Sequence, residues 1–239
     1  FDTLLRQKIN PGPYFLRILN ESVDASASHE KQPSTEPVSK HSQSSGVHSK
    51  MMKPVDLDRA YRIFNIGATT LVSAAHEGKE DVMAAAWASA LDLSPAKATV
   101  VIDKSHYTRP LIEKSGYFAL MIPTASIAPV VMKLGSVSKN DNALKLEESG
   151  AKLVKMPGFD MPMVEGCAAW VVFKVVPEPH NQEAYDLFIG EAVAAWADDR
   201  VYANGRWLFE NAPDDLRSLH YVAGGHFYKI GDALEVPVY

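Results

Sequence analysis

The stretch from Asp81 to Pro110 constrains the fold of this chain more than any other part of its sequence. Residues 82–90 are rich in alanine around Trp87 and predict a strand with small side chains. Residues 97–103 are β-branched and apolar, predict a second strand, and lead into the polar run DKSHYT before a predicted helix. A cation and hydroxyls gathered between a strand and a helix favour the binding of a phosphate group.

The small side chains of residues 82–90 would let a flat ring approach the backbone closely. The stretch therefore predicts a phosphorylated aromatic ligand that lies across two strands. Alanine-rich strands also occur where two sheets pack tightly, so a purely structural role for this strand stays open.

The rest of the body predicts mainly strands with a few helices. The strands are expected at 69–75, 117–122, 168–176 and 185–196, with shorter ones near 151–155 and 226–230. The helices are expected after Asp56, from Thr108 as cap to Ser115, over 127–134 with Gly135 ending it, and over 143–149. Gly190 predicts a bulge or bend in a long strand. This pattern indicates a mainly β fold, a closed antiparallel barrel with added helices.

The chain divides near residue 50. Residues 1–50 contain a segment rich in Ser, His, Lys, Pro and Glu, which predicts a disordered N-terminal extension, either upstream sequence or a tail added for expression. A natural tail that covers a partner subunit is the alternative. Residues 51–239 are expected to form one domain.

Composition excludes several classes of function. The formal net charge is −5 and no basic stripe is present, which argues against nucleic acid as a partner. Cys167 is the single cysteine, so no intrachain disulfide can form, and a reducing cytoplasm is expected. No apolar run is long enough to span a bilayer, and the start of the chain does not look like a secretory signal. GxSxG and HExxH motifs are absent, and no metal site is expected.

From about residue 57 to 235 the chain resembles the flavin reductase-like family of FMN-binding split-barrel proteins, which includes flavoredoxins. The segments that carry the resemblance are VMAAAW with the LDLSP turn, VVIDKSHYTRPLIEKSGYFALMIP, LGSVS, DLFIGEAV and LHYVAGGHFYKIG, in the family's order. The resemblance implies a Greek-key-like split barrel and a homodimer with FMN near its interface. No attachment to a membrane is expected.

The family's binding positions transfer onto this sequence residue by residue. Those beside the flavin ring are Met83, Ala84, Ala85, Ala86, Trp87, Ala88 and Ser89, and those around the phosphate are Asp103, Lys104, Ser105, Tyr107 and Thr108. Ser136 and Ser138 lie in a loop that would approach the cofactor from the side. Each residue also has a structural interpretation: Trp87 as a core aromatic, Lys104 as a solvated charge, Ser105 and Thr108 as helix caps.

The chain departs from the family at several positions. Asp81 and Met121 stand where Asn is common, and Ala85 and Ala86 replace polar residues. Tyr185 occupies the position of a His thought to face the nicotinamide in many reductases. The SGRD-type loop is replaced by residues 138–141.

These features predict an FMN-dependent oxidoreductase, an NAD(P)H:flavin reductase that passes hydride to bound FMN and on to a flavin or protein acceptor. No catalytic residue is certain, and Tyr185 is a candidate platform for the nicotinamide of NADH or NADPH. Two alternatives remain: an FMN-binding electron carrier without its own nicotinamide site, favoured by Tyr185, and a barrel that holds haem or no cofactor.

Overall fold

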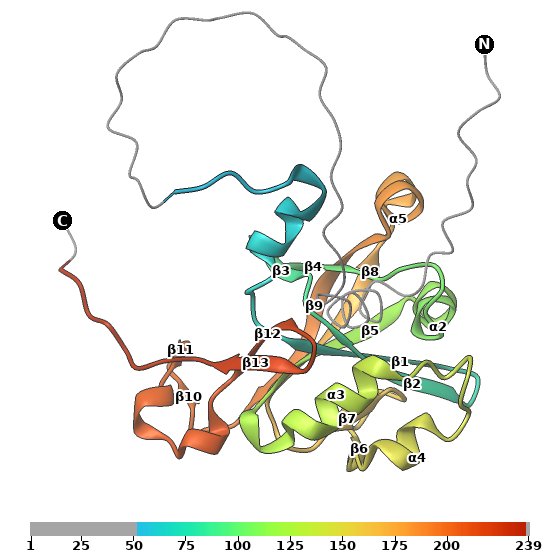
Figure 1. Cartoon of the computed structure of the whole chain (residues 1–239). Coiled ribbons are helices and arrows are strands. Elements are labelled where there is room, and N and C mark those ends of the chain that lie inside the picture. The colour runs from blue at the N-terminus through green and yellow to red at the C-terminus, as the bar shows by residue number, and fades with distance from the viewer. Residues whose placement is uncertain (1–51, 238–239) are drawn as a thin grey trace, which may run out of the picture.

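The computed structural model describes residues 52–237, so the prediction for residues 1–50 lies outside the described residues. A seven-stranded antiparallel sheet forms the body, with the strand order β2-β1-β5-β8-β9-β4-β3. Its strands are β1 (Thr70–His76), β2 (Lys79–Ala85), β3 (Ala88–Leu93), β4 (Ala96–Val101), β5 (Tyr117–Pro123), β8 (Cys167–Val176) and β9 (Leu187–Ala197). The predicted mainly β, split-barrel fold is confirmed (Figure 1).

The two edges of the sheet are β2 and β3, which follow each other directly in the chain. The single strand predicted over 82–90 is therefore wrong: β2 ends at Ala85 and β3 begins at Ala88. Ala86 and Trp87 carry the chain from one edge of the curved sheet to the other. The Val101 amide donates to the Trp87 carbonyl at 3.0 Å and holds this crossing against β4.

Both faces of the central strands are buried, which explains why their sequences are apolar throughout and not alternating. In β1, Leu71 packs into one hydrophobic cluster and its neighbour Val72 packs into the other, on the opposite face. Helix α2 (Thr108–Ser115) covers the face of Val72 through Leu111 and Ile112. Helix α3 (Ala128–Ser136) covers the face of Leu71 (Figure 1).

The helix boundaries correct two predictions. Tyr107 is the N-cap of α2 and Thr108 is its first helical residue, and the Thr108 hydroxyl bonds to Asp81 and does not cap the helix. Helix α3 continues through Gly135 to Ser136, whose hydroxyl donates to the Met132 carbonyl at 2.7 Å.

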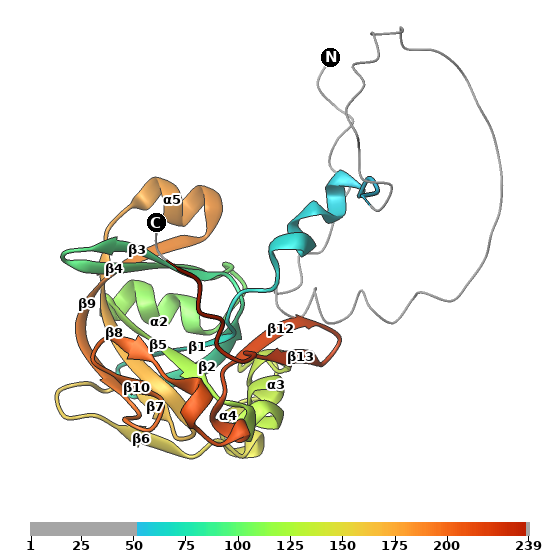
Figure 2. The ribbon, with the colours of Figure 1, turned by 90° about the vertical axis from the view of Figure 1, so that its left-hand side faces the viewer.

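Smaller elements surround the sheet. They are a 3₁₀ helix η1 (Leu57–Phe64), α4 (Lys145–Ser149), α5 (Pro179–Tyr185), the strand pairs β6 (Leu153–Lys155) with β7 (Pro162–Val164), β10 (Tyr202–Ala203) with β11 (Arg206–Trp207), and β12 (Leu219–Ala223) with β13 (His226–Lys229), and the short turns η2 (Ala125–Ile127), η3 (Phe209–Asn211) and η4 (Asp214–Leu216). Helix α5 was not predicted from the sequence. The 3₁₀ helix η1 buries none of its residues and stands away from the body (Figure 2).

Gly190 in β9 has a packing role. A Cβ atom at this position would lie 2.6 Å from Cζ of Phe118 and 2.6 Å from Cβ of Phe173. The rings of Phe118 and Phe173 stack with centroids 5.3 Å apart in the core. The register of β8 and β9 shifts between Val172 and Phe173, opposite Ala192 and Ala194. Gly190 pairs in regular register with Val175 and Ala98, so the irregularity is not at Gly190, where the sequence predicts it.

We expect Gly190→Ala to lower the free energy of unfolding by about 1–3 kcal/mol, because the added methyl group must displace two packed phenylalanines. Urea unfolding followed by tryptophan fluorescence measures the change. Gly231→Ala is the matched control, since a Cβ there meets no atom within 4 Å. Equal stability of both variants would contradict the close packing at Gly190.

Candidate functional site

The turn between β4 and α2, residues 103–108, is shaped by its own aspartate. The Asp103 carboxylate accepts hydrogen bonds from the Ser105 amide at 2.8 Å and from the Ser105 hydroxyl at 2.6 Å. The His106 amide donates to the Asp103 carbonyl at 3.1 Å. Asp103 and Ser105 therefore fold the turn, and the Ser105 hydroxyl bonds within it.

Arg109 fixes both ends of this turn. Its guanidinium is buried and donates to the carbonyl of Ile102, the residue before the turn, at 2.9 Å. The same group ion-pairs with Asp186, the C-cap of α5, and donates to the Gln182 carbonyl in α5 at 2.8 Å. One side chain thus closes the turn and attaches α5 to it.

A buried polar network lies on the other side of the turn. The Thr108 hydroxyl donates to Asp81 Oδ2 at 2.7 Å, and Lys145 Nζ lies 3.1 Å from Asp81 Oδ1. All three residues are at most 4% exposed. Burial lowers the pKa of Lys145, and the attraction of Asp81 acts against this shift. Thr108 was predicted to hold the phosphate, but its hydroxyl belongs to this network.

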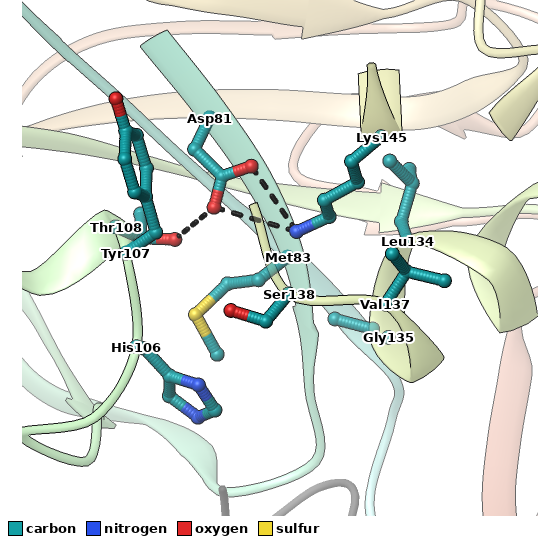
Figure 3. A pocket seen from close by; sticks show the side chains of 11 residues that line it. Asp81, Met83, His106, Tyr107, Thr108, Leu134, Gly135, Val137, Ser138 and Lys145 are labelled. Carbon is teal, nitrogen blue, oxygen red and sulfur yellow. Dashed lines mark hydrogen bonds and ion pairs between the residues drawn. The ribbon is translucent and has the colours of Figure 1, made fainter. Parts of the chain in front are cut away.

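A pocket opens between β2, this turn and the end of α3 (Figure 3). It is lined by Asp81, Met83, Ala84, His106, Tyr107, Thr108, Leu134, Gly135, Val137, Ser138 and Lys145. Its cavity volume of ≈20 Å³ is room for about one water molecule. An aromatic ring is therefore too large to fit inside this cavity.

His106 lies on the opposite side of the pocket from Lys145 (Figure 3). Burial lowers the pKa of His106, while the nearby Asp103 acts in the other direction. The imidazole is therefore neutral near pH 7 and offers one donor and one acceptor nitrogen. His106 stands inside the DKSHYT run, yet sequence analysis gave it no role.

The residues predicted to lie beside the flavin ring, 83–89 (the ring shelf), are divided between β2, β3 and the crossing that joins these two edge strands. Met83, Ala84 and Ala85 are buried in the edge strand β2, and only Met83 and Ala84 line the pocket. Ala86 and Trp87 lie in the crossing itself, where Trp87 Nε1 donates to Asn65 Oδ1 at 3.0 Å. Ala88 and Ser89 lie on β3, and Ser89 is exposed.

Other predicted residues point away from the pocket. Lys104 Nζ donates to Glu183 Oε1 of α5 at 2.8 Å. Ser136 bonds to its own helix, whereas Ser138 lines the pocket. Tyr185 at the end of α5 is 63% exposed, and its ring meets the edge of His180 with centroids 5.7 Å apart. The structure thus unites Met83, Ala84, Tyr107, Thr108 and Ser138 at one pocket, while Tyr185 lies outside it.

Two charged members of the pocket were not predicted from the sequence. Asp81 appeared only as a departure from the family, and Lys145 was not singled out. Their pairing joins residues 64 positions apart, so no local spacing reveals it. The signal available was a lysine in a short helix that follows the LGSVS segment.

The described residues show no reactive thiol, metal site or membrane-spanning helix. Burial raises the pKa of the Cys167 thiol, which disfavours the reactive thiolate. Within residues 52–237, no three His, Cys, Asp or Glu side chains gather as metal ligands. No helix in that range has the length and apolar character needed to cross a membrane.

Comparison with known proteins places this architecture in a family. Residues 65–220 match the model of the flavin reductase like domain. The chain is 38% identical over 181 residues to the uncharacterized protein YddH of Escherichia coli K12, covering 74% of this chain and 94% of that protein. The chain therefore belongs to the flavin reductase-like domain family.

Solved structures show the same fold. An FMN-binding domain of a flavin reductases-like enzyme from Shewanella baltica OS155 is 50% identical, with a TM-score of 0.70 over 77% of this chain and 96% of that one. Flavoredoxin of Desulfovibrio vulgaris (Miyazaki F) has a TM-score of 0.61 at 20% identity, over 79% of this chain and 96% of that one. The flavoredoxin likeness shows the fold alone.

We expect Asp81→Asn to lower the free energy of unfolding by about 3–5 kcal/mol at neutral pH, because the Lys145 ammonium stays buried without its countercharge. The folded-state pKa of Lys145 is already below its ordinary 10.5, so the unfolded state holds more protons between the two pKa values. Stability of the variant should therefore recover as the pH rises toward 10.5.

Urea unfolding at neutral and alkaline pH tests this expectation. Asp92→Asn is the matched control, because Asp92 pairs with Lys97 at the surface and its loss should change stability by less than about 1 kcal/mol. A loss in Asp81→Asn no larger than in the control, or one that grows with pH, would contradict a buried charge pair beneath the pocket.

Proposed function

We propose that this chain binds FMN and is an oxidoreductase that accepts hydride from NADH or NADPH and passes electrons to a flavin or protein acceptor. The observation that carries the proposal is the turn 103–108, which Arg109 and Asp103 hold rigidly beside the edge strand β2 and the pocket. The 50% identical Shewanella structure, an FMN-binding domain, supports the same cofactor.

The residues present suit such a cofactor. Lys104 is the one cation in the turn and would pair with the phosphate. Within residues 52–237 no strand pairs with the outer edge of β2, so its backbone groups can face a ring. Ala84 and Gly135 put little side-chain bulk into the lining of the pocket. When bound, FMN supplies the hydride and electron chemistry.

The protein groups at the pocket would bind and orient this ligand. Neutral His106 offers a hydrogen-bonding nitrogen, and Ser138 offers a hydroxyl at the same pocket. The buried Asp81–Lys145 pair beneath them contributes a fixed dipole without net charge. These groups can hold a polar ring edge in one orientation, which hydride transfer requires.

We further propose a homodimer with the flavin near its interface. The arm of residues 52–66 exposes large apolar side chains, with Leu57 at 91% and Phe64 at 83% exposure, and Leu93 of β3 is 95% exposed. Such apolar surface marks an interaction site. Tyr61 contacts the edge of the Trp87 ring at 6.1 Å, so a partner that covers the arm also lies near the ring shelf. A cytoplasmic setting fits the single cysteine.

Sedimentation velocity tests the dimer. Wild-type protein should sediment as a dimer, whereas Leu57→Asp with Phe64→Asp should give monomers that bind FMN at least about tenfold more weakly, a loss of about 1.4 kcal/mol. Leu234→Asp is the control, because this equally exposed leucine lies outside the arm. Monomeric wild-type protein with full FMN affinity would refute the proposal.

The second candidate function is an electron carrier that receives electrons from another reductase. The position of Tyr185 favours it, because this residue points outside the pocket and replaces the family's His. A carrier needs no nicotinamide site of its own.

Anaerobic stopped-flow reduction separates the two functions. If Tyr185 stacks on the nicotinamide, Tyr185→Ala should raise the KM for NADH or NADPH about three- to tenfold and leave FMN content unchanged. Fast, saturable bleaching of the flavin absorbance near roughly 450 nm is the expected wild-type result for a reductase. Slow bleaching that is linear in nucleotide and identical in both proteins would instead identify a carrier.

A further inference from the structure

The cation expected to hold the flavin phosphate already has a partner. Lys104 Nζ donates to the Glu183 carboxylate at 2.8 Å and to the Glu183 main-chain carbonyl at 2.9 Å. The two side chains are 53% and 79% exposed, so the pair lies in water at the rim of the turn. The bond to Lys104 lowers the pKa of Glu183, so its carboxylate stays charged near neutral pH.

The turn offers no other cation for the phosphate. The hydroxyl of Ser105 donates to Asp103, and the hydroxyl of Thr108 donates to Asp81. An ammonium group has three N–H donors, and Glu183 takes two of those on Lys104. A phosphate that binds at this turn must therefore share Lys104 with Glu183 or displace it.

Displacement is energetically easy. An exposed lysine–carboxylate pair contributes little, because water screens both charges. A phosphate monoester carries nearly two negative charges near pH 7 and forms stronger charge-assisted bonds. The carboxylate left beside the phosphate would also repel it, so Glu183 opposes phosphate binding in two ways.

We infer that Glu183 is a specificity-determining residue: it competes with the flavin phosphate for Lys104, and thereby sets how strongly the protein prefers FMN to riboflavin. This inference rests on the proposed FMN site. Phosphate binding exchanges the Lys104–Glu183 pair for a Lys104–phosphate pair. Arg109 still holds α5 through Gln182 and Asp186, so the exchange stays local to Glu183.

The test compares FMN and riboflavin binding in single variants by quenching of flavin fluorescence at low salt. Glu183→Gln keeps the shape of the side chain and removes its charge, so FMN should bind about two- to fivefold more tightly while riboflavin binding stays unchanged. Glu178→Gln is the matched control, since Glu178 lies at the start of the same helix and makes the same charge change without contacting Lys104. An equal gain in both variants, or none in Glu183→Gln, would overturn the inference.

A double-mutant cycle ties the effect to Lys104. Lys104→Gln should weaken FMN binding, and adding Glu183→Gln to it should bring a clearly smaller gain than in the wild-type background, because only the repulsion by the carboxylate is then left to remove. A full gain in the absence of Lys104 would show that Glu183 acts through another group and overturn the inference, with the proposed function intact. Wild-type protein that binds neither flavin would overturn the proposed function, and this inference with it.

Discussion

The buried guanidinium of Arg109 is the contact on which the arrangement of the site depends. It bonds to Ile102 just after β4, to Asp186 just before β9, and to Gln182 in α5. A planar fork of donors can satisfy several carbonyls and carboxylates at once, which a lysine cannot. The turn that follows β4 and the helix that precedes β9 are therefore fixed relative to each other, although they are about 80 residues apart.

The sheet supplies the second constraint. Because β2 and β3 are consecutive in the chain but lie at opposite edges, the crossing at Ala86 and Trp87 stands where the barrel is split. The edge strand β2 brings the charged Asp81 against Thr108 and Lys145, at the floor of the pocket. A rigid turn, an unpaired strand edge and a paired buried charge thus meet at one place, as a preorganised binding site requires.

Those parts of the fold and of the site that depend on neighbouring residues could be predicted from the sequence. The strands, the helix after the DKSHYT run and the turn itself follow from neighbouring residues. The break between β2 and β3 was missed, because AAAWAS contains no glycine or proline and the break arises from topology. The roles of Thr108 and Lys145 were missed for a similar reason, since both depend on Asp81, 27 and 64 residues away. The partner of Lys104 lies in α5, which was not predicted as a helix.

The central claim is that the turn 103–108 holds the phosphate of FMN, and ³¹P NMR of the FMN complex tests it most directly. Free FMN changes its phosphate resonance as it titrates with a second pKa of about 6. Bound at the turn beside Lys104, the phosphate should stay dianionic, and its shifted resonance should not move between about pH 5 and 8. A bound resonance that titrates like that of free FMN would place the phosphate in water and contradict the account.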